Sequence, residues 1–353
     1  MTGLTRRAVS QGLATLAVSG TAFAQDQGAL RIAFGACARQ NKEQPIWDAI
    51  LAQNPDLFVM LGDGVYADTT NPERMRRAYA QLGDKPGFQR LRAAVPTFAI
   101  WDDHDYGAND SGADYPMKDE SRRQFCDFWG EPAESPRRTQ EGGIYAARVV
   151  ESAGHRVQLI APDLRWNRDP ENSSGGWWRM ARQYVAGQMF RGRAIAGPYQ
   201  TVDDPTATKM LGAAQWAWLE AQFQEPADLR IVCSSLQVLS QGTGWEAWEQ
   251  FPAERARILN LIGQATNVIL LSGDVHYGEF SALERPGAAP LWEATSSGLT
   301  EVWAALPPNA LRAASYRGRN FGLLTVDWAS RSVLMEVRDE QGQTQLAQAV
   351  PFG

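Results

Sequence analysis

Short apolar runs recur along the chain, and segments with helical periodicity separate most of them. Runs of this length, rich in Val, Ile, Leu and Phe, predict buried strands. The predicted strands span residues 30–34, 57–61, 95–100, 144–150, 156–162, 229–233 and 267–271. The predicted helices span residues 45–51, 71–82, 211–223 and 253–265. Strands that alternate with helices predict a layered α/β fold, in which ligands bind at the carboxyl ends of the strands.

Three of the predicted strands run directly into acidic clusters. The clusters are Gly62-Asp63-Gly64-Val65-Tyr66, Trp101-Asp102-Asp103-His104-Asp105 and Ser272-Gly273-Asp274-Val275-His276. Cys37 enters a loop after the strand over residues 30–34 in the same way. Carboxylates that converge at one edge of a sheet repel each other unless a cation neutralises them. The pattern therefore indicates a metal-dependent enzyme.

The donor atoms at these strand ends fall into two groups with different metal preferences. One group offers a thiolate, a phenolate and an imidazole, which favour a polarising ion such as Fe(III). Its members are Cys37, Tyr66 and His276. The other group offers only oxygen atoms, which suit Ca²⁺ or Mn²⁺. Its members are Asp103, Asn109 and Asp274. Asp63, with two oxygens, could bridge the two ions.

Such a pair of metal ions indicates hydrolysis of a phosphoric ester. A two-metal centre generates a hydroxide near neutral pH and clamps the phosphoryl oxygens during in-line displacement. His104 follows Asp103 directly and could protonate the leaving oxygen. Arg165 follows the strand over residues 156–162 and could hold a phosphate through two hydrogen bonds. An ion pair with Asp163 that fixes the next loop is an equal alternative.

Each candidate residue alone has an ordinary structural explanation. Asp63 and Asn109 could be turn residues, Tyr66 could be a packing residue, and the two clustered histidines could be hydrogen-bonded structural groups. Their joint placement at strand ends favours a site. His155 has no acidic cluster beside it, so we expect a structural role for it.

The composition is that of a soluble globular protein. The chain has 353 residues, of which 44% are hydrophobic and 21% charged, and its net charge is −6. The negative charge argues against nucleic-acid binding through a basic surface, and no stretch after the N-terminal segment is long and apolar enough to be transmembrane. The cysteines number three, so at most one disulfide can form.

Residues 1–24 resemble an export signal. Thr5-Arg6-Arg7 precedes an uncharged, mildly apolar stretch, and Ala22-Phe23-Ala24 has the small residues of a cleavage site. This combination is typical of a twin-arginine signal, and an ordinary signal with a chance arginine pair is the alternative. We expect recognition by the twin-arginine export machinery and a periplasmic or secreted protein. Residues 25–353 then form a single domain, with residues 166–210 as a lid, a surface excursion or a plain connecting loop.

Taken together, the motifs resemble the PhoD-like alkaline phosphatases of the metallophosphoesterase superfamily over roughly residues 28–330. They are the three acidic clusters, Asp163-Leu164-Arg165, Ser235-Leu236-Gln237 and Thr295-Ser296-Ser297-Gly298. The resemblance implies a four-layer α/β/β/α sandwich around a dinuclear centre of Fe(III) and Ca²⁺, with Cys37 and Tyr66 as iron ligands. The chain departs from the family pattern at Ala36, Asp105 and Gln237, which concerns the second metal site more than the reaction.

The leading hypothesis is a secreted metal-dependent phosphoric-ester hydrolase that acts on a small phosphoester. A metal-bound hydroxide would attack phosphorus, with His104 as general acid. One alternative is a phosphodiesterase or a phospholipase D-type hydrolase, in which the Trp-rich segment 166–218 would contact the rest of the substrate. Another is a non-catalytic protein that binds phosphate or a lipid headgroup on a decayed enzyme scaffold, although retention of the candidate ligands argues against decay.

Overall fold

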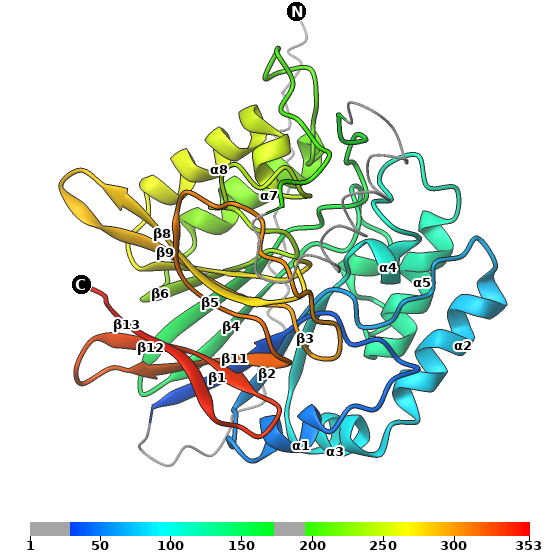
Figure 1. Ribbon diagram of the computed structural model, residues 1–353, viewed down its shortest axis with the longest axis horizontal. Coiled ribbons are helices and arrows are strands. Elements are labelled where there is room, and N and C mark those ends of the chain that lie inside the picture. The colour runs from blue at the N-terminus through cyan, green and yellow to red at the C-terminus, as the bar shows by residue number, and fades with distance from the viewer. Residues whose placement is uncertain (1–28, 173–194) are drawn as a thin grey trace, which may run out of the picture.

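The computed structural model describes residues 29–172 and 195–353, which form two β-sheets packed face to face (Figure 1). The strands of the first sheet are β1 (Leu30–Gly35), β2 (Leu57–Leu61), β3 (Thr97–Ile100), β11 (Asn320–Asp327), β12 (Ser332–Asp339) and β13 (Thr344–Pro351). Their order is β13-β12-β11-β1-β2-β3. The neighbours β1, β2 and β3 are parallel, so their carboxyl ends lie at one edge of the sheet.

The second sheet has seven strands in the order β10-β8-β9-β7-β6-β5-β4. The strands are β4 (Ala146–Ser152), β5 (His155–Ala161), β6 (Leu229–Cys233), β7 (Val268–Ser272), β8 (Gly278–Arg285), β9 (Ala288–Ser296) and β10 (Arg312–Tyr316). Strands β5, β6, β7 and β9 run parallel. This sheet therefore also has an edge at which several carboxyl ends meet.

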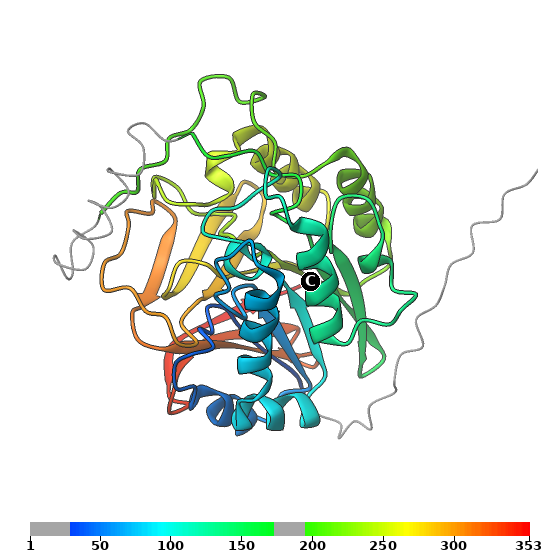
Figure 2. The same cartoon turned by 90° about the vertical axis from the view of Figure 1, so that its right-hand side faces the viewer.

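Helices cover the outer faces of both sheets (Figure 2). The helices are α1 (Ile46–Leu51), α2 (Pro72–Gly83), α3 (Pro86–Ala94), α4 (Asp103–Tyr106), α5 (Lys118–Trp129), α7 (Ala213–Gln224) and α8 (Pro252–Gly263). Alternation along β1 sends Ile32 and Phe34 into the core between the sheets and Ala33 into the core under α1 and α3. A third core lies under α7 and α8. The fold is the expected four-layer α/β/β/α sandwich.

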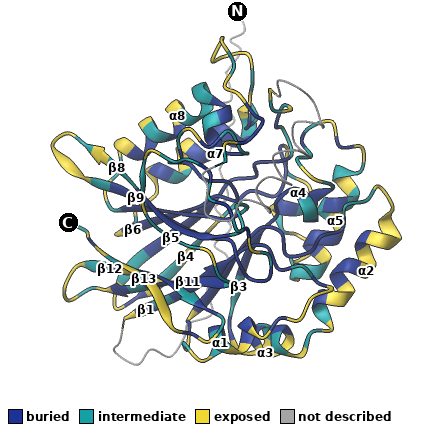
Figure 3. Ribbon diagram, viewed as in Figure 1, coloured by how far each residue is buried: buried dark blue, intermediate teal, exposed yellow. Residues whose placement is uncertain are grey.

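Burial follows the same layering (Figure 3). The central strands are buried, whereas the outward face of α2 is exposed. Helix α2 begins at a well-defined cap, because the Asn71 side chain accepts hydrogen bonds from the backbone N–H groups of Glu73 and Arg74, and Pro72 occupies the first turn. This cap fixes the helix next to the loop that follows β2.

The predicted strands and helices are all present, with boundaries within two residues of those expected. The helix expected around Cys126 is α5, and the short strands expected over residues 291–350 correspond to β9–β13. Helices α3 and α4 and strand β8 were not predicted. The predicted signal at residues 1–24 and about half of the 166–210 segment, residues 173–194, lie outside the described residues. Among the described helices, none is long and apolar enough to cross a membrane.

Candidate metal centre

Loops at the carboxyl ends of four strands bring most of the predicted site residues together. They are Cys37 after β1, Asp63 and Tyr66 after β2, Asp103 and His104 in α4 after β3, and Asp274 and His276 after β7. Their potential ligand atoms form overlapping groups, and the atoms within a group lie within 4.8 Å of one another. The groups are Cys37–Asp63–His276, Asp63–Asp103–His104, Asp102–Asp103–Asp274 and Asp103–Asp110–Glu246. Shared members make them one continuous cluster.

The backbone at this cluster is locally strained. Cys37, Asp63, Asp274 and His276 all have positive φ, at 64°, 53°, 66° and 62°. Each such residue costs about 1–3 kcal/mol, and conformations of this kind gather at functional sites. The glycine before Asp63 is required by close packing, since a Cβ on Gly62 would lie 2.4 Å from the Asp102 Cβ. The loops after β2 and β3 thereby approach each other closely.

One side of the cluster carries the sulfur donor, and we call Cys37, Asp63, Tyr66 and His276 the thiol side. The Cys37 Sγ lies 3.5 Å from Asp63 Oδ2 and 3.0 Å from Ser297 Oγ. The Tyr66 hydroxyl lies 3.1 Å from His276 Nε2. Ser297 Oγ also accepts a 3.0 Å hydrogen bond from the His276 backbone N–H. The thiol, phenol and imidazole therefore face one small volume. All three cysteines are free and buried, so Cys37 is in no disulfide.

The other side carries only oxygen donors, and we call Asp102, Asp103, Asp110 and Glu246 the acidic side. Within the described residues, Asp102 Oδ2 and Asp103 Oδ1 are buried without a hydrogen-bond partner. A buried carboxylate oxygen left unpaired is costly and calls for an ion. Asp274 lies between the two sides, because its carboxylate approaches Asp102 and Asp103.

The protonation of the cluster fits a metal site. Burial, with repulsion from nearby carboxylates, raises the pKa of Asp63 and Asp274 well above the usual range. The same causes raise the pKa of the Cys37 thiol. Burial lowers the pKa of His276 to about 4, so its imidazole is neutral and able to bind a metal. A cation in the cluster would favour the deprotonated carboxylates and thiolate, which are the forms that bind metals.

His104 lies among carboxylates at the edge of the cluster. Its Nδ1 lies 2.6 Å from Asp68 Oδ1, and its backbone N–H donates to Asp63 Oδ1 at 3.3 Å. The ring packs against Tyr66 with 4.2 Å between centroids. Burial opposes the charged imidazolium, but the carboxylates of Asp103, Asp63 and Asp68 prevail and raise the pKa of His104 to about 11. The imidazole therefore carries a proton at neutral pH.

Arg165 lies beneath the site, where carboxylates surround it. Its Nε donates to Asp102 at 2.5 Å, and its two terminal nitrogens donate to Glu246 at 2.6 and 2.8 Å. The guanidinium is fully buried. Asp163 accepts the Arg165 backbone N–H rather than the guanidinium. A phosphate could therefore reach Arg165 only after these ion pairs break, and the expected local ion pair with Asp163 is also not the one formed.

Asn109 is exposed in a turn, whereas the neighbouring Asp110 lies near Asp103 and Glu246 on the acidic side. The Asp110 backbone N–H donates to Asp103 Oδ2 at 2.7 Å, and its carboxylate accepts from the Tyr199 hydroxyl. Residue 110 adopts positive φ and turns back toward α4, which adds Asp110 to the oxygen donors of this region, and the assignment of Asn109 stays a prediction.

Four neighbouring residues were not assigned from the sequence: Asp68, Asp110, Glu246 and Ser297. Asp68 and Asp110 lie within seven residues of named candidates and could have been included as nearby acids. Ser297 belongs to a motif that was noticed without a role. Glu246 lies in a loop without apolar or acidic patterning, so only the fold shows its position.

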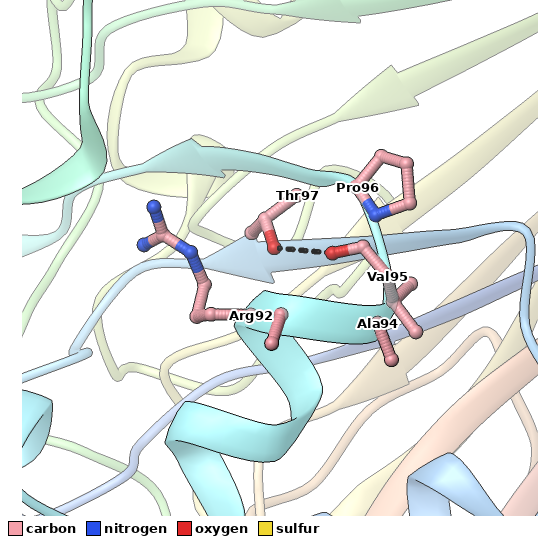
Figure 4. Close-up of a pocket in the computed structure, with 6 residues that line it drawn as sticks. Arg92, Ala94, Val95, Pro96 and Thr97 are labelled. Atoms are coloured by element: carbon pink, nitrogen blue, oxygen red, sulfur yellow. Dashed lines mark hydrogen bonds between the residues drawn. The ribbon is translucent and has the colours of Figure 1, made fainter.

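A separate cavity of about 400 Å³ lies at the amino end of β3, away from this cluster (Figure 4). Its wall is the segment from Arg92 to Thr97. The Thr97 hydroxyl donates to the Val95 carbonyl at 3.4 Å, and the Arg92 guanidinium packs over the Trp129 ring at 4.8 Å. The groups of potential metal ligands found among residues 29–172 and 195–353 lie instead at the carboxyl ends of the strands.

Comparison with known proteins agrees with this geometry. The family model described as PhoD-like phosphatase matches residues 32–320, a span that contains every candidate site residue. No curated protein gives a significant match. A solved structure of PhoD is similar with a TM-score of 0.64 and 16% identity, and the match covers 92% of this chain and 72% of that chain.

Two further solved structures share the fold with a TM-score of 0.55. One is a dimetal phosphatase from Danio rerio, at 15% identity, covering 92% of this chain and 100% of that chain. The other is GAP50, described as the anchor in the inner membrane complex of Plasmodium, at 12% identity, covering 92% of this chain and 90% of that chain. At these identities the likeness establishes the sandwich, and the residues of the site must carry the chemistry.

Proposed function

The chain belongs to the PhoD-like phosphatase family and is a metal-dependent phosphoester hydrolase, and we propose that it is an exported one that hydrolyses small phosphoric esters at the cluster described above. The observation that carries the proposal is the continuous cluster in which buried carboxylate oxygens of Asp102 and Asp103 lack a hydrogen bond and Asp63 links Asp103 to the Cys37 thiol. Such an arrangement requires cations, and a decayed scaffold would have no reason to keep it.

We assign the ligands by donor chemistry. The thiol side would hold Fe(III), because the anionic thiolate of Cys37 and phenolate of Tyr66, with the imidazole of His276, favour a polarising ion. Ca²⁺ or Mn²⁺ would be held by oxygens from Asp103 and Asp274, with Asp63 able to reach both ions. A bound dinuclear centre supplies an activated water and neutralises phosphoryl oxygens.

His104 completes the reaction on the leaving-group side. Its imidazolium would give its proton to the departing oxygen, and Asp68 holds the ring in place through Nδ1, which leaves Nε2 for the substrate. Arg165 would act as a positioning residue, since it orients Asp102 and Glu246 and is fully paired. Export rests on the resemblance of residues 1–24 to a twin-arginine signal, with a periplasmic or secreted location as the proposed outcome.

The experiment compares turnover of p-nitrophenyl phosphate and bis-p-nitrophenyl phosphate by metal-loaded protein. We expect monoester hydrolysis that stops after chelation and returns when metal is added. Faster diester turnover would identify a phosphodiesterase. Full activity in metal-free protein, or no turnover of either compound, would contradict the proposal. His104→Ala should lower kcat about 10²–10⁴-fold for phenyl phosphate and less for p-nitrophenyl phosphate, whose leaving group needs little protonation.

A further inference from the structure

A second cavity, of about 300 Å³, adjoins the metal cluster. It lies between α2 and the loops after β1 and β2, and its wall includes Arg39, Gln40, Tyr66, Asp68, Arg74 and Arg77. Tyr66 and Asp68 also belong to the site, since one contacts His276 and the other holds His104. The cavity is therefore continuous with the side of the site on which His104 lies.

The wall of the cavity is strongly basic. Arg74 and Arg77 lie one turn apart on α2, so their side chains share a face of the helix. Within the described part of the chain, neither guanidinium forms an ion pair or hydrogen bond, because the nearest acid on α2, Glu73, pairs with Arg76 instead. Two exposed cations thus face the cavity without a partner.

The remaining charges of the wall are already balanced. The Arg39 guanidinium lies 4.1 Å from the Tyr66 ring centroid and pairs with Glu301 at 3.2 Å. Asp68 is the acid among the wall residues, and it pairs with His104. The Gln40 side chain is fixed by two hydrogen bonds to the backbone of Tyr66, at 2.8 and 3.1 Å. An anion in the cavity, beside Arg74 and Arg77 on α2, would balance the charge of these two side chains.

We propose that this cavity binds an anionic group carried by the leaving-group part of the substrate, with Arg74 and Arg77 as its cationic contacts. The proposal rests on the proposed function. Tyr66 contacts His276 and Asp68 contacts His104, and both line the cavity, so a substrate whose phosphoryl group lies at the cluster would extend its leaving group past them toward α2. Guanidinium groups match the planar or tetrahedral oxygens of carboxylates and phosphates. A volume of about 300 Å³ is at the small end of ligand pockets, which favours a compact acid over a nucleoside or a lipid.

The test compares three esters with leaving groups of similar acidity. They are phenyl phosphate, 3-carboxyphenyl phosphate and phenyl phosphate with a second phosphate at the 3-position. We expect kcat/KM to be about tenfold higher for an anionic ester than for phenyl phosphate, which corresponds to about 1.4 kcal/mol. The preference should appear in KM and should weaken at high salt. The two anionic esters show whether carboxylate or phosphate is preferred.

Substitutions on α2 test whether its arginines cause the preference for anionic esters. Arg74→Gln combined with Arg77→Gln should reduce the ratio of anionic to neutral kcat/KM to near one, whereas Arg76→Gln, an exposed arginine on the same helix that pairs with Glu73, should leave the ratio intact. A ratio near one in the wild type, or one that survives the double substitution, would overturn this inference while leaving the proposed function in place. If no ester is hydrolysed at all, the proposed function fails and the inference fails with it.

Discussion

The thiol side and the acidic side of the site are both buried, but their charges are balanced in different ways. On the acidic side, Arg165 and Arg168 pair with Glu246 and, despite burial, hold the pKa of Glu246 below its usual range. On the thiol side, no arginine or lysine of the described chain pairs with Cys37 or Asp63. Burial and the neighbouring carboxylates instead raise the pKa of the Cys37 thiol.

This difference separates the charges that the protein balances with its own side chains from the charges that a bound metal must balance. On the acidic side, Arg165 and Arg168 offset part of the carboxylate charge, so more of its geometry should survive the loss of a metal. The thiol side contacts Ser297, and the cations near it lie beside Asp63 (His104) and over the Tyr66 ring (Arg39) rather than at Cys37. The Cys37 thiol and the Tyr66 phenol would therefore be protonated in metal-free protein. Metal loss should therefore change the thiol side first, and loss of a buried arginine should damage the acidic side first.

Arg165→Met should have the largest effect, and it acts on stability. It leaves Asp102 and Glu246 buried without their shared cation, and a broken buried pair typically lowers the free energy of unfolding by about 3–5 kcal/mol. Denaturant unfolding of metal-free protein measures the loss. Arg257→Met is the control, because its exposed pair with Glu220 should contribute only about 0–1 kcal/mol. Equal losses in the two variants would contradict the comparison.

His276→Ala should act on metal binding with the fold preserved. It removes a neutral imidazole from the thiol side, and we expect metal affinity to fall by more than the roughly 10–100-fold typical of outer-shell partners. Metal analysis after dialysis measures retention. His155→Ala is the matched control, since His155 stacks on Trp328 with 4.3 Å between centroids, remote from the cluster. Retained metal in His276→Ala would remove His276 from the ligand set.

Ser297→Ala should give the smallest of the three effects. Ser297 contacts the Cys37 Sγ and accepts the His276 backbone N–H, so its loss should weaken metal binding about 10–100-fold without unfolding the protein. Ser296→Ala is the control, because the Ser296 hydroxyl donates instead to Asn320 at 2.8 Å. A greater loss of metal in Ser296→Ala than in Ser297→Ala would show that the thiol side is not oriented by this hydroxyl.

The sequence predicted candidate ligands best where the ligand directly follows a strand along the chain. Apolar runs ending in Gly-Asp predicted both the strands and the ligand positions, because burial and close backbone approach select the residues in each. Helix α3 was not predicted because it begins with Pro86 and Gly87, which are typical of a turn. Its helical conformation depends on packing of Phe88 against Trp47. Its stability is tertiary and leaves little local signal.

The acidic side was less predictable for the same reason. Glu246 meets Arg165 across 81 positions of sequence, and no local pattern marks either residue as the partner of the other. Arg165 was noticed, but the two roles expected for it were a phosphate contact and a local ion pair with Asp163, and neither is the buried network with Asp102 and Glu246. Long-range ion pairs are set by the fold, so they become visible only once both sheets are in place.

The hydrogen-bonding contact between Cys37 and Ser297 also determines when the site can form during protein synthesis. The two residues are 260 positions apart. At roughly 5–20 residues per second, a ribosome needs about 13–50 s to go from one to the other. During this time β1 lacks its neighbour β11, which follows Ser297 in the chain. Contacts of such sequence separation also form late in folding. The nascent chain therefore has a long interval in which its cysteine and aspartates are open to the wrong ion, and the complete site can form only after the chain has nearly left the ribosome.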